Sequence, residues 1–197
     1  MTNSKFDFVK LSDICDVRDG THDSPKYVEK GYPLITSKNI KDGIIDFTDV
    51  NNISEEDFIK DNQRSFVDDG DILMPMIGTI GNPIVVKKDR EFAIKNVALI
   101  KFIKKSLINN RFLKAILGSE YFNDNYRNFS SGSTQKFISL TFIRNLQIPL
   151  PPLSVQEEIV SKIESYEKEI ENYKLKIIEL ERKIKNKISS VWDGSEK

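Results

Sequence analysis

The sequence predicts a mixed α/β domain followed by one long coiled-coil helix. Short β-favouring runs, separated by turn residues, occupy the first 150 residues. A proline cluster at 149–153 then interrupts the chain, and an apolar repeat with alternating spacings of four and three residues follows it. We therefore expect one domain over residues 1–150 and a helical arm over residues 151–197.

The expected strands of the domain are runs rich in Ile, Val, Leu and Phe that are bounded by Gly, Asn, Asp or Pro. A helix is expected from Asn110 to about Tyr126, because apolar residues recur there at helical spacing. The expected strands lie at 33–36, 44–47, 71–77, 84–86 and 92–103.

The arm is expected to be a helix over about 155–191, on the order of 55 Å long. Pro149, Pro151 and Pro152 cannot lie inside a helix or a central strand, so they separate it from the domain. Ser154 and Glu157 have the spacing of a capping box at its start. The predicted coiled-coil seam consists of Ile159, Ile163, Tyr166, Ile170, Tyr173, Ile177, Leu180 and Ile184.

This seam forms a narrow apolar stripe with charged residues beside it, as in a helix that pairs with another helix. The domain offers no obvious second helix of matching length. We therefore expect the arm to pair with a helix outside this chain, including a second copy of itself. The alternative is an amphipathic helix that packs back on its own domain.

The 197-residue chain has 30 Lys and Arg against 30 Asp and Glu, so its formal net charge is zero. This balance excludes a strongly basic or polyacidic molecule as a whole. The balance is uneven along the chain: 9 against 16 in residues 1–71, 12 against 4 in 72–150, and 9 against 10 in 151–197. The basic middle segment is compatible with a phosphate-binding face, or it is neutralised by the acidic first segment.

The composition and motifs predict a binding protein without catalytic or metal-ligating residues. With one Cys and one His, the chain has too few ligands for a Cys/His zinc site and no disulfide framework. Residues 132–136 lack the glycine spacing of a Walker A motif, and His22 lies in a loop typical of turns or ligand contacts. No apolar run approaches a membrane span, so we expect a soluble, cytoplasmic protein without membrane partners.

Residues 128–136 form a polar loop rich in hydroxyls and amides and ending in Lys136. Backbone N–H groups, hydroxyls and a lysine are groups that bind phosphates, and Gln135 has the chemistry to read a base edge. A solvated connector is the alternative interpretation.

Several motifs in order resemble the DNA specificity (S) subunit of type I restriction–modification systems. The resemblance covers about residues 9–184. A typical S subunit is about twice as long, with two recognition domains and two helical spacers, so this chain resembles a half-length form. A further departure is Val155, where family members commonly carry Glu. The motifs are Asp-Gly-Thr-His-Asp-Ser-Pro-Lys-Tyr at 19–27, Pro-Leu-Ile-Thr-Ser-Lys-Asn-Ile at 33–40, Gly-Asp-Ile-Leu at 70–73, Gly-Thr-Ile-Gly at 78–81, Gly-Ser-Thr-Gln-Lys at 132–136 and Pro-Leu-Pro-Pro-Leu at 149–153.

The resemblance implies a target recognition domain over 1–150 and a helical spacer and dimerisation arm over 151–197. It implies a non-catalytic subunit that reads double-stranded DNA and positions methyltransferase and restriction subunits. S-adenosylmethionine belongs to the methyltransferase, so no cofactor is expected in this chain. A homodimer would read two half-sites of a gapped inverted repeat. The alternative is a regulatory module that pairs with other specificity subunits and alters their targeting.

Within this resemblance, the expected DNA contacts lie in three loops. Lys38 and Lys136 are expected at phosphates, and His22, Asn39 and Gln135 are expected at base edges. For each residue, a turn-stabilising or surface polar role is the alternative. The full set is Thr21, His22, Tyr27, Lys38, Asn39, Ser133, Thr134, Gln135 and Lys136.

Overall fold

The structure is a computed structural model that describes residues 5–77, 81–130 and 137–192. It divides into two compact units, Met1–Gln156 and Glu157–Lys197. The first unit, called the body below, contains short strands and helices, and the second, called the arm, is helical. The predicted fold class, a mixed α/β domain followed by a long helix, is confirmed.

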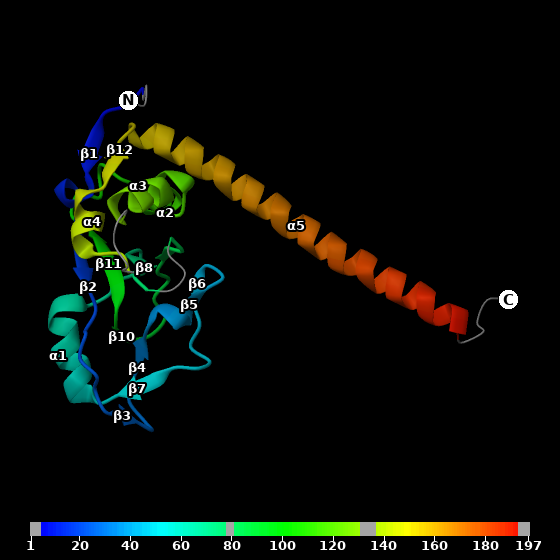
Figure 1. Ribbon diagram of the computed structural model, residues 1–197, viewed down its shortest axis with the longest axis horizontal. Coiled ribbons are helices and arrows are strands. Elements are labelled where there is room, and N and C mark those ends of the chain that lie inside the picture. Colours follow the sequence, from blue (N-terminus) through cyan, green and yellow to red (C-terminus); the bar gives the residue numbers. More distant parts are fainter. Residues whose placement is uncertain (1–4, 78–80, 131–136, 193–197) are drawn as a thin grey trace. The chain divides into compact units, whose positions relative to one another are not determined.

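The core of the body is an antiparallel sheet of four strands in the order β2-β11-β8-β9. Its two central strands, β8 and β11, are buried on both faces, because consecutive residues such as Ile72, Leu73 and Met74 are fully inaccessible. Figure 1 shows β11 between β2 and β8. The strands are β2 (Cys15–Asp19), β8 (Ile72–Pro75), β9 (Ile84–Val85) and β11 (Val97–Phe102).

A second sheet has the order β10-β4-β7-β3, in which only the β10–β4 pair is parallel. Two further pairs complete the body: the β5–β6 hairpin, and β1 with β12 near the two ends of the unit. The strands are β1 (Phe8–Lys10), β3 (Tyr27–Val28), β4 (Tyr32–Ile35), β5 (Ile40–Lys41), β6 (Ile44–Ile45), β7 (Asn51–Ile53), β10 (Ala93–Ile94) and β12 (Gln147–Pro149).

Helices cover the sheets. Helix α1 begins after Ser54, whose hydroxyl accepts a hydrogen bond from the Asp57 N–H, as an N-cap does. Helix α4 lies against the outer strand β2, where Arg144 donates two hydrogen bonds to the Val17 carbonyl. The helices of the body are α1 (Glu55–Ser65), α2 (Asn110–Leu117), α3 (Glu120–Ser130) and α4 (Leu140–Asn145), with short 3-10 helices η1 (Leu11–Asp13) and η2 (Ser37–Asn39).

Two predicted elements are divided in the structure. The expected strand over 92–103 is two strands, β10 and β11, because the chain turns at Asn96, whose φ is +54°. The expected helix over 110–126 is likewise two helices, which are interrupted at Gly118 and Ser119. Helices α1 and α4 were not predicted from the sequence.

Helix α5 spans Leu153–Trp192 and therefore begins earlier than expected. The N–H groups of Val155 and Gln156 donate to the Pro152 carbonyl, so the predicted capping box at Ser154 is wrong: this serine lies inside the first turn. Gln156 is fully buried, accepts from the Asn109 N–H at 2.8 Å, and donates to the carbonyls of Leu107 and Pro151 at 2.9 and 2.8 Å. These three bonds fasten the first turn of α5 within the body.

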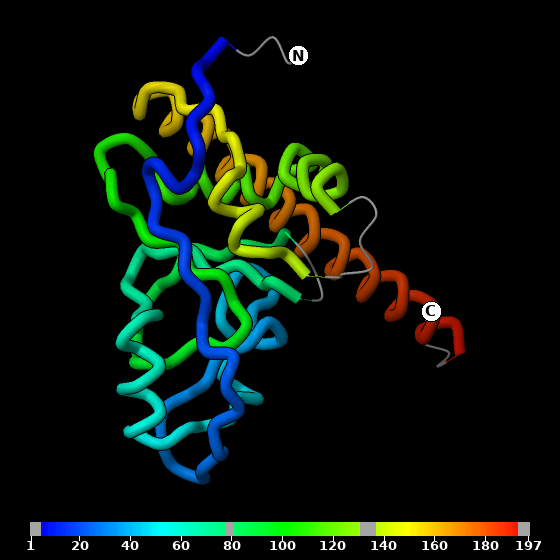
Figure 2. The backbone as a smooth tube through the Cα atoms, turned by 60° about the vertical axis from the view of Figure 1, so that its left-hand side comes forward, coloured from blue at the N-terminus to red at the C-terminus, as the bar shows by residue number. Residues whose placement is uncertain are grey.

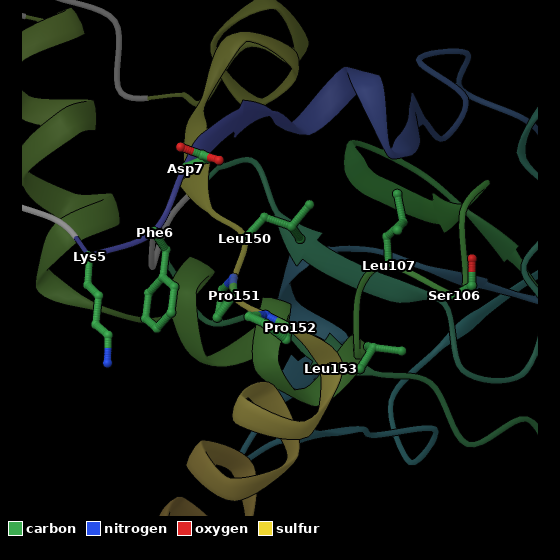
Figure 3. Close-up of a pocket in the computed structure, with 9 residues that line it drawn as sticks. All are labelled: Lys5, Phe6, Asp7, Ser106, Leu107, Leu150, Pro151, Pro152 and Leu153. Carbon is green, nitrogen blue, oxygen red and sulfur yellow. The ribbon is translucent and has the colours of Figure 1, made fainter.

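Beside this first turn lies an open pocket of about 560 Å³, shown in Figure 3. Its lining mixes polar and apolar residues and comes from three segments that are distant in the sequence. They are the N-terminal residues Lys5, Phe6 and Asp7, the loop residues Ser106 and Leu107, and the proline cluster with Leu150, Pro151, Pro152 and Leu153.

The arm exposes most of its apolar side chains. The predicted seam residues Tyr166, Ile170, Tyr173, Ile177, Leu180 and Ile184 are 46–67% exposed, and Leu175 and Ile178 outside the seam are equally open. Ion pairs between neighbouring turns, such as Glu158 with Lys162 at 2.9 Å, support the helix. Within the described ranges, no helix is long and apolar enough to cross a membrane.

Candidate nucleic-acid interface

Three loops of the body meet where β2, β4 and β10 end. The Thr21 N–H donates to the Ile94 carbonyl at 2.9 Å, and the Lys95 N–H donates to the Ile35 carbonyl at 2.8 Å. The hydroxyl of Ser37 in η2 reaches the Asn96 carbonyl at 3.4 Å. Figure 2 shows α1, in cyan, running beside the segment that follows β2. We call this place the loop junction: residues 19–24, 37–39 and 95–96, with Lys60 and Arg64 of α1.

Glycine at position 20 allows the loops to approach this closely. A Cβ atom there would lie 2.1 Å from the Ile94 carbonyl oxygen and 2.8 Å from the Lys95 nitrogen. Both distances are far below van der Waals contact, so any side chain would force the loop after β2 away from β10. The close approach of β10 therefore explains why the 19–27 motif has a glycine at position 20.

A chain of polar contacts crosses the junction through His22. Its Nε2 lies 2.7 Å from Asp19 Oδ2, and its Nδ1 lies 2.7 Å from Asn96 Oδ1. Both partners present acceptor oxygens, so the protonated ring donates to both, and the hydrogen bonds with Asp19 and then Asn96 raise the pKa of His22. Asp19 is also paired with Arg64 of α1.

Basic side chains surround this chain of contacts. Lys60 is paired with Asp23 at 3.0 Å, and the Lys95 ammonium donates to the Ser24 hydroxyl at 3.0 Å. Lys38 of η2 and Arg64 are exposed. Exposed pairs of this kind are weak, so a phosphate can replace the present partners at little cost. The junction is therefore a polar surface with an excess of cations.

The sequence-predicted site residues fall into four groups. Thr21, His22 and Lys38 lie in the junction, whereas Tyr27 is 55% exposed on β3, at the opposite edge of the second sheet from β10. Asn39 is 5% exposed, and its amide is occupied by hydrogen bonds with Thr36, Asp46 and Asp49. Ser133, Thr134, Gln135 and Lys136 lie outside the described residues.

Sequence reasoning missed Lys60, Arg64, Lys95 and Asn96. For Asn96 a signal exists, because an Asn inside the apolar run 92–103 is the residue type that tolerates a left-handed turn. Lys60 and Arg64 lie on α1, whose sequence is strongly polar, so no apolar pattern revealed the helix.

The described residues provide no evident site for a metal or a nucleophile. Among them, no group of three or more His, Cys, Asp or Glu side chains is placed to hold a metal ion. Burial raises the pKa of the Cys15 thiol to about 12, so this cysteine stays neutral inside the core.

The acidic and basic segments neutralise each other in part. Lys101 of the basic segment pairs with Asp68 at 2.8 Å and with Asp71 at 2.6 Å, both from the acidic segment. Other pairs, such as Lys88 with Glu91, stay within the basic segment. The junction combines cations from both segments, so its charge does not follow from the segment totals.

Comparison with known proteins shows the family to which this chain belongs. The family model described as "Type I restriction modification DNA specificity domain" matches residues 3–182, so the chain belongs to this family. The resemblance inferred from the motifs is thereby confirmed.

Individual relatives are specificity subunits. The MjaVIII specificity subunit of Methanocaldococcus jannaschii is 29% identical over 189 residues, which are 93% of this chain and 42% of that protein. The EcoBI specificity subunit of Escherichia coli is 28% identical over 152 residues, 74% of this chain and 32% of that protein. The prediction that the chain is not an enzyme agrees with these relatives, and the chain spans less than half of their length.

Solved structures share the fold. A chain from a study of complex assembly and conformational transition of the type I R-M system aligns with a TM-score of 0.68 at 20% identity, covering 98% of this chain and 46% of that one. The HsdS subunit from Thermoanaerobacter tengcongensis aligns with a TM-score of 0.60 at 18% identity, covering 86% of this chain and 39% of that one.

Proposed function

We propose that this chain recognises a specific sequence in double-stranded DNA for a type I restriction–modification system. The observation that carries the proposal is the family match over residues 3–182. The loop junction supports it, because cations beside neutral hydrogen-bonding groups suit a surface that holds phosphates and reads bases. The target recognition domain is proposed as residues 1–150, and the spacer as residues 151–197.

Lys38 is the proposed phosphate contact of the junction, together with Lys60, Arg64 and Lys95. Thr21 and Tyr27 remain proposed contacts, Tyr27 from its separate place on β3. Asn39 is proposed to hold the loop that presents Lys38, because its amide already bonds within that loop. Ser133, Thr134, Gln135 and Lys136 keep their proposed roles, with Lys136 at a phosphate and Gln135 at a base edge.

The arm is proposed to pair with the arm of a second copy, antiparallel and through the seam from Ile159 to Ile184. The open apolar side chains of Ile170, Ile177 and Ile184 support this pairing, because water contact with them is unfavourable. The 40 residues of α5 correspond to about 60 Å, enough to separate two readers by one DNA turn of about 34 Å. Such a dimer would read a gapped inverted repeat.

The proposed protein partners are the methyltransferase and restriction subunits of the same system. S-adenosylmethionine would be bound by the methyltransferase subunit, and no residue of this chain is assigned to it.

Selection of bound duplexes from a random pool, with purified protein and methyltransferase subunit, tests the proposal. Recovery of two identical half-sites in inverted orientation, at one fixed gap, is the expected result. A second candidate is a regulatory chain that pairs with other specificity subunits, which the exposed apolar side chains of the arm would equally allow. No enriched sequence, combined with tight binding to an intact specificity subunit, would support that candidate and overturn the first.

A further inference from the structure

We infer that Asn96 reads a base in the DNA major groove, with adenine as the preferred base, and that His22 is the positioning residue that orients its amide. This inference rests on the proposed function, and it names a specificity-determining residue of that site. Three features of the junction carry it: the backbone of Asn96, the orientation of its side chain, and the cations beside it.

The backbone of Asn96 is fixed by contacts from two other loops. Its N–H donates to the Thr21 carbonyl at 3.3 Å, and its carbonyl accepts from the Ser37 hydroxyl at 3.4 Å. Its φ of +54° lies in the left-handed region, as at the tip of a tight turn between β10 and β11. The side chain is therefore presented from a turn that two other loops support, as base reading requires.

The amide of Asn96 is oriented by His22. The protonated ring donates from Nδ1 to Asn96 Oδ1, and its other nitrogen is held by Asp19, which Arg64 pairs with from α1. This contact leaves the Asn96 amide nitrogen without a hydrogen-bond partner among the described residues, and one lone pair of Oδ1 free. A donor and an acceptor side by side match N7 and N6 of adenine, the usual partner of asparagine in the major groove.

Two lysines that are adjacent in sequence to junction residues are available for phosphate contacts. Lys38 follows Ser37, and Lys95 precedes Asn96 in the chain. Phosphate contacts set the register of a protein on the duplex, and base contacts then discriminate. Lys38 and Lys95 are thus proposed to hold the backbone while Asn96 meets the base edge between them. His22 itself, with both ring nitrogens engaged, is not the base reader.

Duplex selection with the whole chain and the methyltransferase subunit tests the inference by comparing wild-type protein with Asn96→Asp. The carboxylate has the same shape, tolerates the left-handed backbone and keeps its contact with His22, but it lacks the donor for N7. One adenine of the half-site should lose its preference by about 5- to 150-fold, and cytosine, which offers an N4 donor, should replace it.

Asn96→Gly is the second variant, because glycine is the residue best suited to this φ. It should lose the same preference without gaining cytosine. If the wild type enriches a half-site and both variants enrich it unchanged, the inference is overturned and the proposed function stands. If the wild type enriches nothing, the proposed function falls and the inference falls with it.

The role of His22 is tested by the pH dependence of the base preference. The charged groups that act on the ring are Asp19 from β2, Arg64 from α1 and Asp23 from the same loop. Once deprotonated, the ring keeps one N–H for Asp19, and its bare Nδ1 faces Asn96, so the amide turns its donor inward. The adenine preference should therefore weaken as the pH rises from below about 6.5, the ordinary histidine pKa, through the raised pKa of His22 in the wild type, and be independent of pH in His22→Ala. A preference that is unchanged over this range in the wild type contradicts the orienting role.

Discussion

The body and the arm differ in how far they bury their apolar side chains. In the body, Leu73 and Leu99 are fully buried, and the buried Gln156 has three hydrogen bonds. In the arm, Ile170 and Ile177 are 54% and 53% exposed. Because exposed branched side chains at regular spacing gain nothing in a lone helix, the difference supports the proposal that the arm pairs with a partner surface.

The largest effect is expected from Ile170→Asp, which places a charge in the predicted seam of the arm and changes no residue of the body. In a dimer the change would bury an unpaired carboxylate from each copy, so self-association should weaken by at least about 100-fold. Sedimentation equilibrium measures the change. Asn172→Asp adds the same charge outside the seam and should leave association nearly unchanged. Equal behaviour of the two variants would show that the seam does not mediate pairing.

Gly20→Ala is expected to destabilise the body at the loop junction. The added methyl group would lie 2.1 Å from the Ile94 carbonyl oxygen, so the free energy of unfolding should fall by about 3 kcal/mol. The control is Gly43→Ala, where φ is +79° but no atom lies within 4 Å of the added Cβ, so backbone strain alone costs about 1 kcal/mol. Urea unfolding compares them, and equal losses would contradict the close approach.

The two regions also differ in how far the sequence predicts them. The arm follows from a local repeat, so its helix and its apolar positions are predicted residue by residue, apart from the start, where Pro152 replaces Ser154 as the cap. The class of the body is predicted from its runs and turns. Its boundaries are less predictable, because a single Asn96 divides one apolar run into two strands.

The loop junction is the least predictable part, because its partners are far apart in the sequence. Asp19 pairs with Arg64, which is 45 residues away in the sequence, and His22 contacts Asn96, which is 74 residues away. Residue type alone does not separate the two asparagines: the Asn39 amide bonds within its own loop, whereas the Asn96 side chain contacts His22 from another loop. Lys38 is exposed on η2, and its phosphate contact stays a prediction.

A smaller effect is expected from Lys38→Gln, which tests the proposed binding of DNA by the body. Loss of one phosphate contact should reduce the salt dependence of binding by about 0.9 in the slope of log K against log salt concentration. The matched control is Lys30→Gln, an exposed lysine between β3 and β4. Fluorescence anisotropy on one duplex at several salt concentrations measures both, and identical slopes for the two variants would remove Lys38 from the interface.

The smallest effect concerns the stability of the junction itself. The pKa of His22 is raised in the folded protein by Asp19 and Asn96, so its contribution is complete below the pKa of the unfolded chain and is lost as pH rises through the folded pKa. The side chain is 60% exposed, so solvent screening keeps this contribution below about 1 kcal/mol. The free energies of unfolding of the wild type and His22→Gln should differ most below about pH 6.5, the ordinary histidine pKa, and converge as the pH rises through the raised pKa of His22. A difference that grows with pH would contradict the protonated bridge.

In the proposed dimer, two bodies read DNA at a spacing that the paired arms fix. The direct measurement is the affinity of the wild-type protein for its selected inverted repeat, compared with the same repeat after its gap is lengthened by about five base pairs. That insertion turns the half-sites to opposite faces of the duplex. The longer gap should reduce the affinity on the order of 100-fold, as expected when two linked contacts become one. Equal affinity for the two duplexes would contradict it.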